Sequence, residues 1–212
     1  MAGPEPEGVR TARLVVRSPR EADRARFIEL FRDADFMAFY PEAFTVTEAS
    51  ERFDHMVAVC RAVPFGKQPV VERSSGLIVG YTGVDHIAFE GRTWLEWGYR
   101  LIPARRGRGY ATEASRALLA GAQQTYRGEL LAIIAPGNLA SQNVAAKLGF
   151  AFWKQAPVDG DLRNLYTLTV SQSGRWAAQA GQNKSDQASS DPVWERTCQR
   201  SGKNGRNRVP RR

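Results

Sequence analysis

Residues 96–103 read EWGYRLIP and residues 106–114 read RGRGYATEA, and these two runs carry the strongest fold signal in the chain. They predict a strand over 93–102, a glycine-rich turn and a helix. Glycines let a backbone approach a ligand closely, and the free N–H groups of a helix start attract anions. Because Arg106 and Arg108 add positive charge, the turn predicts a phosphate or pyrophosphate site. The spacing matches neither a Walker loop nor the dinucleotide fingerprint, and a plain strand-to-helix turn is the alternative.

A second informative run, NLASQNVAAKLGF, occupies residues 138–150. The unbroken apolar segment before it, at 130–135, is typical of a strand that is buried on both faces. Asn138 then predicts the N-cap of a helix, and Gly149 predicts its C′ residue.

The rest of the chain adds apolar segments of strand character and two further helices. The expected strands lie near 12–17, 69–73, 77–81, 150–155 and 164–170. One helix follows Ser18, which predicts an N-cap with Glu21 completing a capping box, and another begins near 45–47. This order of elements predicts a single mixed α/β domain.

The net charge divides unevenly along the chain. Thirty Lys and Arg against 22 Asp and Glu give +8, but residues 171–212 alone hold nine basic and three acidic residues. Residues 1–170 therefore carry only 21 against 19, so the charge does not indicate a nucleic-acid partner for the folded part. We expect residues 1–10 to be disordered, a domain over 11–170, and a basic, low-complexity, disordered tail over 171–212.

No apolar run is long enough to cross a bilayer, and the Pro-rich, acidic start does not resemble a signal peptide. A cytoplasmic protein without a membrane partner is therefore expected. A weak contact between the basic tail and nucleic acid stays open, and so does a homodimer.

The two runs also resemble a known family. Arg106–Ala111 is similar to the Gln/Arg-x-x-Gly-x-Gly/Ala coenzyme A loop of the GNAT superfamily of N-acetyltransferases, and residues 138–150 resemble the second signature of its RimJ/RimL branch. The similarity spans roughly residues 11–170. It implies an α/β GNAT fold whose mixed, mostly antiparallel sheet has six to seven strands flanked by about four helices.

The resemblance implies that acetyl-CoA is the co-substrate and indicates where it binds. Backbone N–H groups of Arg108–Ala111 would hold its pyrophosphate, and its pantetheine arm would run between the strands at 94–102 and 130–135, which splay apart in this fold. Main-chain groups around Tyr99 and Leu101 would bind the arm like an added strand. The expected cofactor-binding residues are Tyr99, Leu101, Arg106, Gly107, Arg108, Gly109, Tyr110, Ala111 and Asn138.

Two side chains are candidates for acid–base chemistry. Strand alternation separates Glu96 from Tyr99, and a carboxylate within an inner strand is costly unless it is solvated, paired or used. Glu96 is therefore the candidate general base, the alternatives being a salt bridge to an arginine from elsewhere or a role in orienting substrate. On the RimJ/RimL pattern Ser141 is the candidate acid for the leaving thiolate; alternatively it only closes the first helical turn after Asn138.

Other reactive residues are weaker candidates. His86 and His55 are more typical of structural or exposed histidines, and two histidines with two cysteines cannot build a zinc site, so no metal is expected. Neither Cys60 nor Cys198 suits a thiol intermediate. A cluster of aromatic residues borders the acceptor site in this family or packs on the core: Phe36, Phe39, Tyr40 and Phe44.

The sequence thus predicts an acetyl-CoA-dependent N-acetyltransferase whose acceptor is a primary amine. The RimJ/RimL resemblance favours a protein N-terminal α-amine. An enzyme that acetylates a small amine, such as an antibiotic or a polyamine, is the first alternative. A module that binds acyl-CoA without turnover is the second.

Overall fold

The computed structural model describes residues 8–38 and 43–171 of the chain. The expected disorder of the first seven residues and of the tail after residue 171 lies outside this part. Four α-helices are present in it: α1 (Arg24–Arg32), α2 (Val46–Ala62), α3 (Tyr110–Thr125) and α4 (Leu139–Lys147). Two short 3-10 turns precede α1 and α3: η1 (Glu21–Asp23) and η2 (Pro103–Arg105). The strands are β1 (Val9–Arg10), β2 (Leu14–Val16), β3 (Gln68–Glu72), β4 (Ile78–Phe89), β5 (Arg92–Leu101), β6 (Gly128–Ile134), β7 (Ala151–Val158) and β8 (Asp161–Val170).

The strands form one mixed sheet in the order β1-β2-β3-β4-β5-β6-β8-β7. Every neighbouring pair is antiparallel except β5 and β6, which run parallel. The expected mixed, mostly antiparallel sheet is confirmed, but it has eight strands in the described residues rather than six to seven. The additional strand is β1, which pairs Val9 with Val16 and Arg10 with Val15. Two residues are too few to show strand alternation, so residues 9 and 10 were wrongly assigned to a disordered end.

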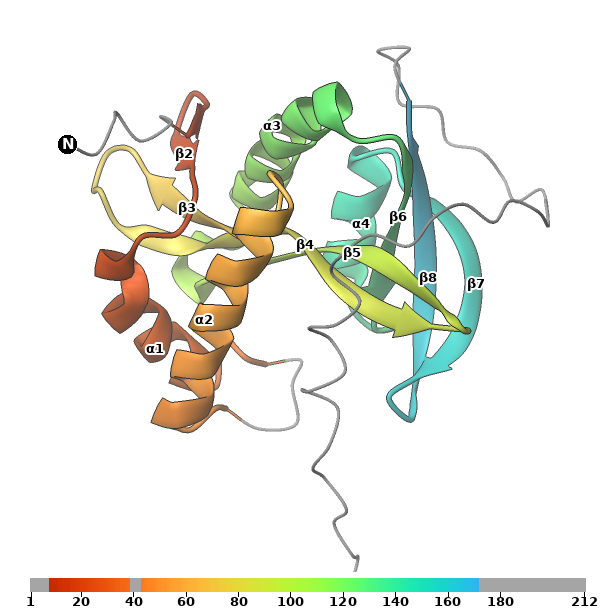
Figure 1. The fold of residues 1–212 in the computed structure, drawn as a ribbon, viewed down its shortest axis with the longest axis horizontal. Helices are drawn as coiled ribbons and strands as arrows, with labels where there is room; N and C mark the ends of the chain where they lie inside the picture. The colour runs from red at the N-terminus through yellow and green to blue at the C-terminus, as the bar shows by residue number, and fades with distance from the viewer. Residues whose placement is uncertain (1–7, 39–42, 172–212) are drawn as a thin grey trace, which may run out of the picture. The chain divides into compact units, whose positions relative to one another are not determined.

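Helices cover both faces of the sheet (Figure 1). One core cluster packs α1 and α2 against β4, with Phe27 and Phe53 fully buried. A second cluster packs α3 and α4 against the central strands, with Leu119 and Leu130 fully buried. A third, smaller cluster lies among the strands around the fully buried Leu165. Alternate residues of β4 and β5 therefore face different helix pairs.

Local capping signals place most of the helix ends. Thr45 Oγ1 accepts a hydrogen bond from the Glu48 amide and Glu48 accepts one from the Thr45 amide, so α2 begins with a complete capping box. Asn138 Oδ1 accepts from the Ser141 amide at 3.0 Å and caps α4. Gly149, with φ at 88°, follows that helix as its C′ residue. The predicted helix start near residues 45–47, the Asn138 cap and the Gly149 C′ residue are confirmed. The capping box at Thr45 was not predicted.

The predicted start of the first helix is wrong. Ser18 is not the N-cap, because the chain first forms η1 and α1 begins only at Arg24. The Asp23 carboxylate accepts from the Arg20 amide at 2.8 Å and forms two hydrogen bonds with the Arg17 guanidinium, at 2.6 and 2.7 Å. This charge-assisted pair stabilises the later start.

Candidate active site

The two parallel strands β5 and β6 separate in the middle of the sheet. They pair only where Leu95 lies opposite Leu130 and Glu96 lies opposite Leu131. Beyond this point β5 continues along β4, and β6 continues along β8. The splay expected from the family is thus present. Backbone groups on the facing edges of the separated halves have no ladder partner in the described residues, so an extended chain can bind there as an added strand.

The start of α3 lies at the end of β5 and has an open N-terminus. Gly107 and Gly109 have φ angles of 71° and 79°. A Cβ at Gly109 would meet only the Arg13 guanidinium, at 3.5 Å. The side chains of Thr45 and Asn138 cap α2 and α4, whereas no side chain among the described residues caps α3 at Gly109. The first amides of α3 therefore remain available to an anion.

The arginines before α3 do not all face that opening. Arg106 donates from Nε to the Leu101 carbonyl at 3.1 Å and from Nη2 to the Asp35 carbonyl at 2.6 Å. Its guanidinium thus positions the end of β5. Arg108 has an exposed side chain, and its carbonyl accepts from Arg13 at 2.9 Å. Arg108 is therefore the better placed of the two for a phosphate.

A carboxylate on β3 ties down the first residue of α3. Arg105 forms a two-pronged pair with Glu72, at 2.8 and 2.9 Å, and the Tyr110 hydroxyl donates to the same carboxylate at 2.8 Å. The Ser75 hydroxyl donates a further hydrogen bond at 2.7 Å. These hydrogen bonds, above all those from Arg105, lower the pKa of Glu72 to about 2. The sequence did not indicate this contact, which anchors the glycine-rich turn to the sheet.

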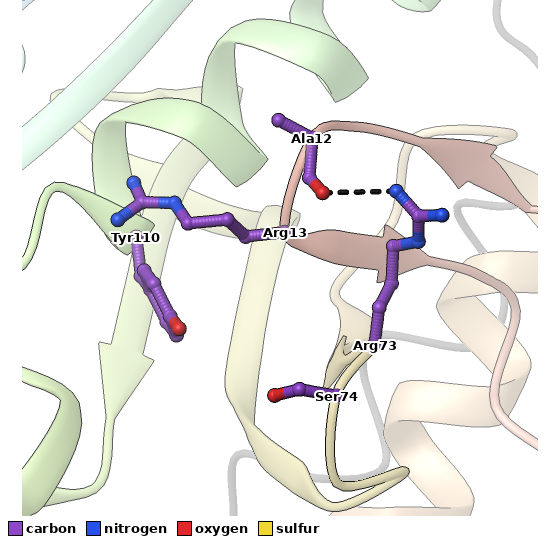
Figure 2. A pocket seen from close by; sticks show the side chains of 5 residues that line it. All are labelled: Ala12, Arg13, Arg73, Ser74 and Tyr110. Carbon is purple, nitrogen blue, oxygen red and sulfur yellow. Dashed lines mark hydrogen bonds between the residues drawn. The ribbon is translucent and has the colours of Figure 1, made fainter.

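A hollow of about 500 Å³ lies beside the start of α3 (Figure 2). Its lining residues are Ala12, Arg13, Arg73, Ser74 and Tyr110. Arg13 lies over the Tyr110 ring, at 4.6 Å, and pairs with Glu113 of α3 at 2.6 Å. Arg73 donates to the Ala12 carbonyl at 2.9 Å. Arg13 thus holds the N-terminal segment against the glycine-rich turn and α3, and Arg73 holds the same segment against the end of β3. The sequence did not indicate these contacts.

Two hydroxyl groups meet on the α3–α4 side of the separated strands. Tyr99 projects from β5, and its Oη lies 3.1 Å from Oγ of Ser141 in the first turn of α4. Asn138 fixes that turn through the Ser141 amide. Burial raises the pKa of Tyr99, although the hydrogen bond with Ser141 and the charge of Arg106 oppose the shift. Tyr99 therefore stays protonated near neutral pH.

Glu96 lies on the opposite face of the sheet, towards α2. It is paired across the strands with Asp85 of β4. Nζ of Lys67, from the segment between α2 and β3, lies 3.5 Å from Glu96 and 3.3 Å from Asp85. The Glu96 side chain remains 20% exposed, whereas that of Lys67 is 12% exposed. The carboxylate is thus paired with a lysine, not with an arginine, and still reaches solvent.

Asp85 joins this face of the sheet to α2. Its carboxylate contacts His55 Nε2 at 2.8 Å, Arg52 at 2.9 Å and Lys67 at 3.3 Å. Burial alone would raise the pKa of Asp85, but the hydrogen bond with His55 and the nearby cations outweigh it and hold the pKa well below its usual range. Burial lowers the pKa of His86. His55 is therefore engaged by Asp85, while Glu96 remains the carboxylate nearer the splayed strands.

Comparison with known proteins agrees with this geometry. The sequence model of the family described as "Acetyltransferase (GNAT) domain" matches residues 13–151. The chain belongs to the GNAT acetyltransferase family. YkkB of Bacillus subtilis (strain 168), itself uncharacterised, is 30% identical over 146 residues, which are 68% of this chain and 85% of YkkB.

Solved structures of acetyltransferases share the fold. A protein from Bordetella pertussis described as a GNAT-family acetyltransferase is 25% identical, with a TM-score of 0.68 over 74% of this chain and 96% of that one. The ribosomal-protein-S5-alanine acetyltransferase from Vibrio fischeri is 19% identical, with a TM-score of 0.63 over 79% and 97%. These structures share the fold, and the match to the family model confirms the expectation of an acetyl-CoA-dependent acetyltransferase.

The aromatic residues and the two cysteines are the remaining candidates in this acetyltransferase. Phe36 and Phe44 pack with Phe31 in the core under α1 and α2, while Phe39 and Tyr40 lie outside the described residues. Burial raises the pKa of the Cys60 thiol to about 12, so Cys60 stays protonated. Cys198 also lies outside the described residues.

Metal binding and membrane insertion are the last two properties of the described residues. Among the described residues, no group of three or more His, Cys, Asp and Glu side chains could hold a metal ion. No helix in the described part of the chain is long and apolar enough to span a membrane.

Proposed function

We propose that this acetyltransferase is RimJ/RimL-like and transfers the acetyl group of acetyl-CoA directly to the N-terminal α-amine of a protein. Glu96 would take up the proton of the attacking amine, directly or through water, and Ser141 would donate a hydrogen bond and a proton to the departing sulfur. Both roles rest on the positions of these groups around the separated strands.

The chain has a place for each part of the co-substrate. The open first turn of α3, from Arg108 to Ala111, suits a diphosphate because no side chain in the described part of the chain caps its amides. The facing edges of β5 and β6 suit the amide-rich pantetheine arm, with main-chain groups of Tyr99 and Leu101 on one side. Asn138 and Ser141 line the other side from α4. The thioester would then lie where the strands part.

The placement of Glu96 and Ser141 on opposite faces supports a direct transfer. An amine that approaches from the α2 side would reach the carbonyl carbon near Glu96, while the sulfur would leave on the α4 side near Ser141. Acid and base would thus act on different atoms without competing for one position.

The ion pair of Glu96 with Lys67 is the observation that favours an α-amine. A carboxylate is a weak base, and one already paired with an ammonium group is suited to an acceptor that needs little deprotonation. At pH 7 about one in ten N-terminal α-amines is neutral, against about one in 2,500 lysine-type amines, from pKa values near 7.9 and 10.4. This difference favours an α-amine over a lysine-type amine as the acceptor at neutral pH.

Free-thiol release from acetyl-CoA across a panel of acceptors tests the proposal. The informative pair is one peptide with a free N-terminus and the same peptide with a blocked N-terminus and a free lysine. At pH 7 we expect kcat/KM to be at least about 100-fold higher for the free N-terminus, in proportion to the neutral amine available.

Two results would contradict the proposal. Higher kcat/KM for an aminoglycoside or a polyamine than for every peptide would identify a small-amine enzyme. Coenzyme binding without thiol release for any amine would identify a binding module.

A further inference from the structure

A pair of hydroxyl groups connects β5 to α4 beside the point where β5 and β6 separate. Tyr99 belongs to β5 and Ser141 to α4, and their oxygens are 3.1 Å apart although the residues are 42 positions apart in the chain. Ser141 is also held by its amide, through the Asn138 cap at 3.0 Å. The serine hydroxyl thus has a fixed place, and its nearest side-chain partner is a phenol. The inference below deepens the proposed function and rests on it.

A serine alone is a poor proton source for a departing thiolate. Alkyl hydroxyls are far weaker acids than thiols, whereas a phenol, with an ordinary pKa near 10, lies close to a thiol near 8.5. Proton transfer is efficient when donor and acceptor are closely matched. The Tyr99 phenol is kept protonated by burial, so it is loaded with the proton that the reaction requires.

We propose that Tyr99 supplies, through Ser141, the proton that the leaving sulfur takes up. As the carbon–sulfur bond breaks, its electron pair stays on sulfur, and the sulfur takes the proton of the Ser141 hydroxyl. The Ser141 oxygen takes the proton of Tyr99, and the Tyr99 phenolate regains a proton from water. The proton that the amine loses passes to Glu96 and then to water, so the protons balance over one turnover. Tyr99 is in this sense a positioning residue that acts through Ser141.

The groups around Tyr99 are consistent with this direction of transfer. The Arg106 guanidinium acts on the phenol from the segment after β5 and favours its anionic form, and Ser141 acts from α4. Glu96, Lys67 and Asp85 lie on the other face of the sheet. The charge of Arg106 therefore offsets part of the cost that burial imposes on a transient Tyr99 phenolate, and the carboxylates lie apart from it.

Titration of bound coenzyme A tests the relay without any amine acceptor. The thiolate of bound coenzyme A absorbs in the ultraviolet, so its pKa can be measured in the wild type and in Tyr99→Phe, Ser141→Ala and the double variant. A hydrogen bond donated to the thiolate lowers the thiol pKa. We expect Tyr99→Phe to raise it by about one pH unit, Ser141→Ala to raise it at least as much, and the double variant to match Ser141→Ala.

Tyr126→Phe is the matched control, because the Tyr126 hydroxyl also makes one hydrogen bond, to the Glu129 carbonyl at 3.1 Å. This control is expected to leave the thiol pKa unchanged. An unchanged thiol pKa in Tyr99→Phe would overturn the relay. The relay would also be overturned if Tyr99→Phe raised the thiol pKa as much in the Ser141→Ala background as in the wild type. The phenol would then act independently of the serine.

Turnover gives a second, separate reading. With a peptide acceptor, Tyr99→Phe is expected to lower kcat about 10- to 100-fold with KM for acetyl-CoA within about twofold, and to lower kcat no further in the Ser141→Ala background. Full additivity of the two substitutions would overturn the relay. If no peptide is acetylated, the α-amine proposal fails while the thiol titration still decides the role of Tyr99.

Discussion

Gly109 is the residue on which the phosphate site depends. Its φ is 79°, and no side chain of the described residues caps the first amides of α3, which are therefore open. We expect Gly109→Asp to raise the Kd for acetyl-CoA about 100-fold, because a carboxylate would lie where the diphosphate binds. Calorimetry measures the change. Gly91→Asp is the control, since Gly91 has a similar φ of 76° in the β4–β5 turn and has open space around it. Equal losses in both variants would contradict the site.

Substitution of Glu96 tests its proposed role as the general base. Glu96→Gln keeps the shape of the side chain but removes its ability to accept a proton, so kcat is expected to fall about 100-fold or more while acetyl-CoA binds as before. Thiol-release assays measure kcat, and calorimetry measures the affinity for acetyl-CoA. Glu129→Gln is a matched control, because Glu129 also lies in a strand and pairs with Arg92 at 3.5 Å. An unchanged kcat in Glu96→Gln would assign the proton transfer to another group.

Lys67 connects the segment between α2 and β3 to the strands β4 and β5. Its ammonium lies between two carboxylates that face each other across the strands. Lys67→Met is expected to lower the free energy of unfolding by about 2 kcal/mol, because it leaves Asp85 and Glu96 without their shared cation. Urea denaturation gives the value. Lys154→Met, which breaks a more exposed pair with Glu90, is expected to cost under about 1 kcal/mol. Equal costs would show that Lys67 is only a surface charge.

The link between β3 and the start of α3 predicts a pH dependence. The pKa of Glu72 is about 2 in the folded chain, against an ordinary 4.5. Because the folded-state pKa is the lower one, this contact stabilises the fold fully above pH 4.5 and loses its effect as the pH falls towards 2. Glu72→Gln should therefore make unfolding less steeply dependent on pH in that window, as followed by circular dichroism. An unchanged slope would mean that other carboxylates govern acid unfolding.

We expect the domain to fold and to bind acetyl-CoA without the tail that follows residue 171. The last strand, β8, ends at Val170, which is 2% exposed and pairs with Gly128. A chain that ends after residue 171 is expected to bind acetyl-CoA within about twofold of the full chain, since the proposed site lies within residues 96–141. A chain that ends after residue 160 lacks β8 and should not fold, because β8 joins β6 to β7. Calorimetry and circular dichroism test both, and a large loss of affinity in the first chain would give the tail a part in binding.

Local signals were sufficient where one stretch of backbone decides the outcome. The helix start near residues 45–47, the Asn138 cap, the Gly149 helix end and the glycine-rich turn follow from short-range hydrogen bonds and backbone sterics. The prediction of the first helix start at Ser18 was wrong, because the Arg17–Asp23 pair stabilises a later start. The strand β1 was missed because two residues carry no periodicity.

Spacing and family resemblance were enough to select Glu96, Ser141 and Gly109 as candidates, since each stands in a recognisable local pattern, and their roles stay predictions. The contacts that these residues and their neighbours make could not be predicted. Lys67 reaches Glu96 from 29 residues away, Tyr99 meets Ser141 across 42, and Arg13 pairs with Glu113 across 100. Such contacts depend on strand order and register, which no local stretch specifies, because a shift of one residue would turn each side chain to the other face. Folding alone therefore decided which carboxylate has a lysine beside it and which serine has a phenol.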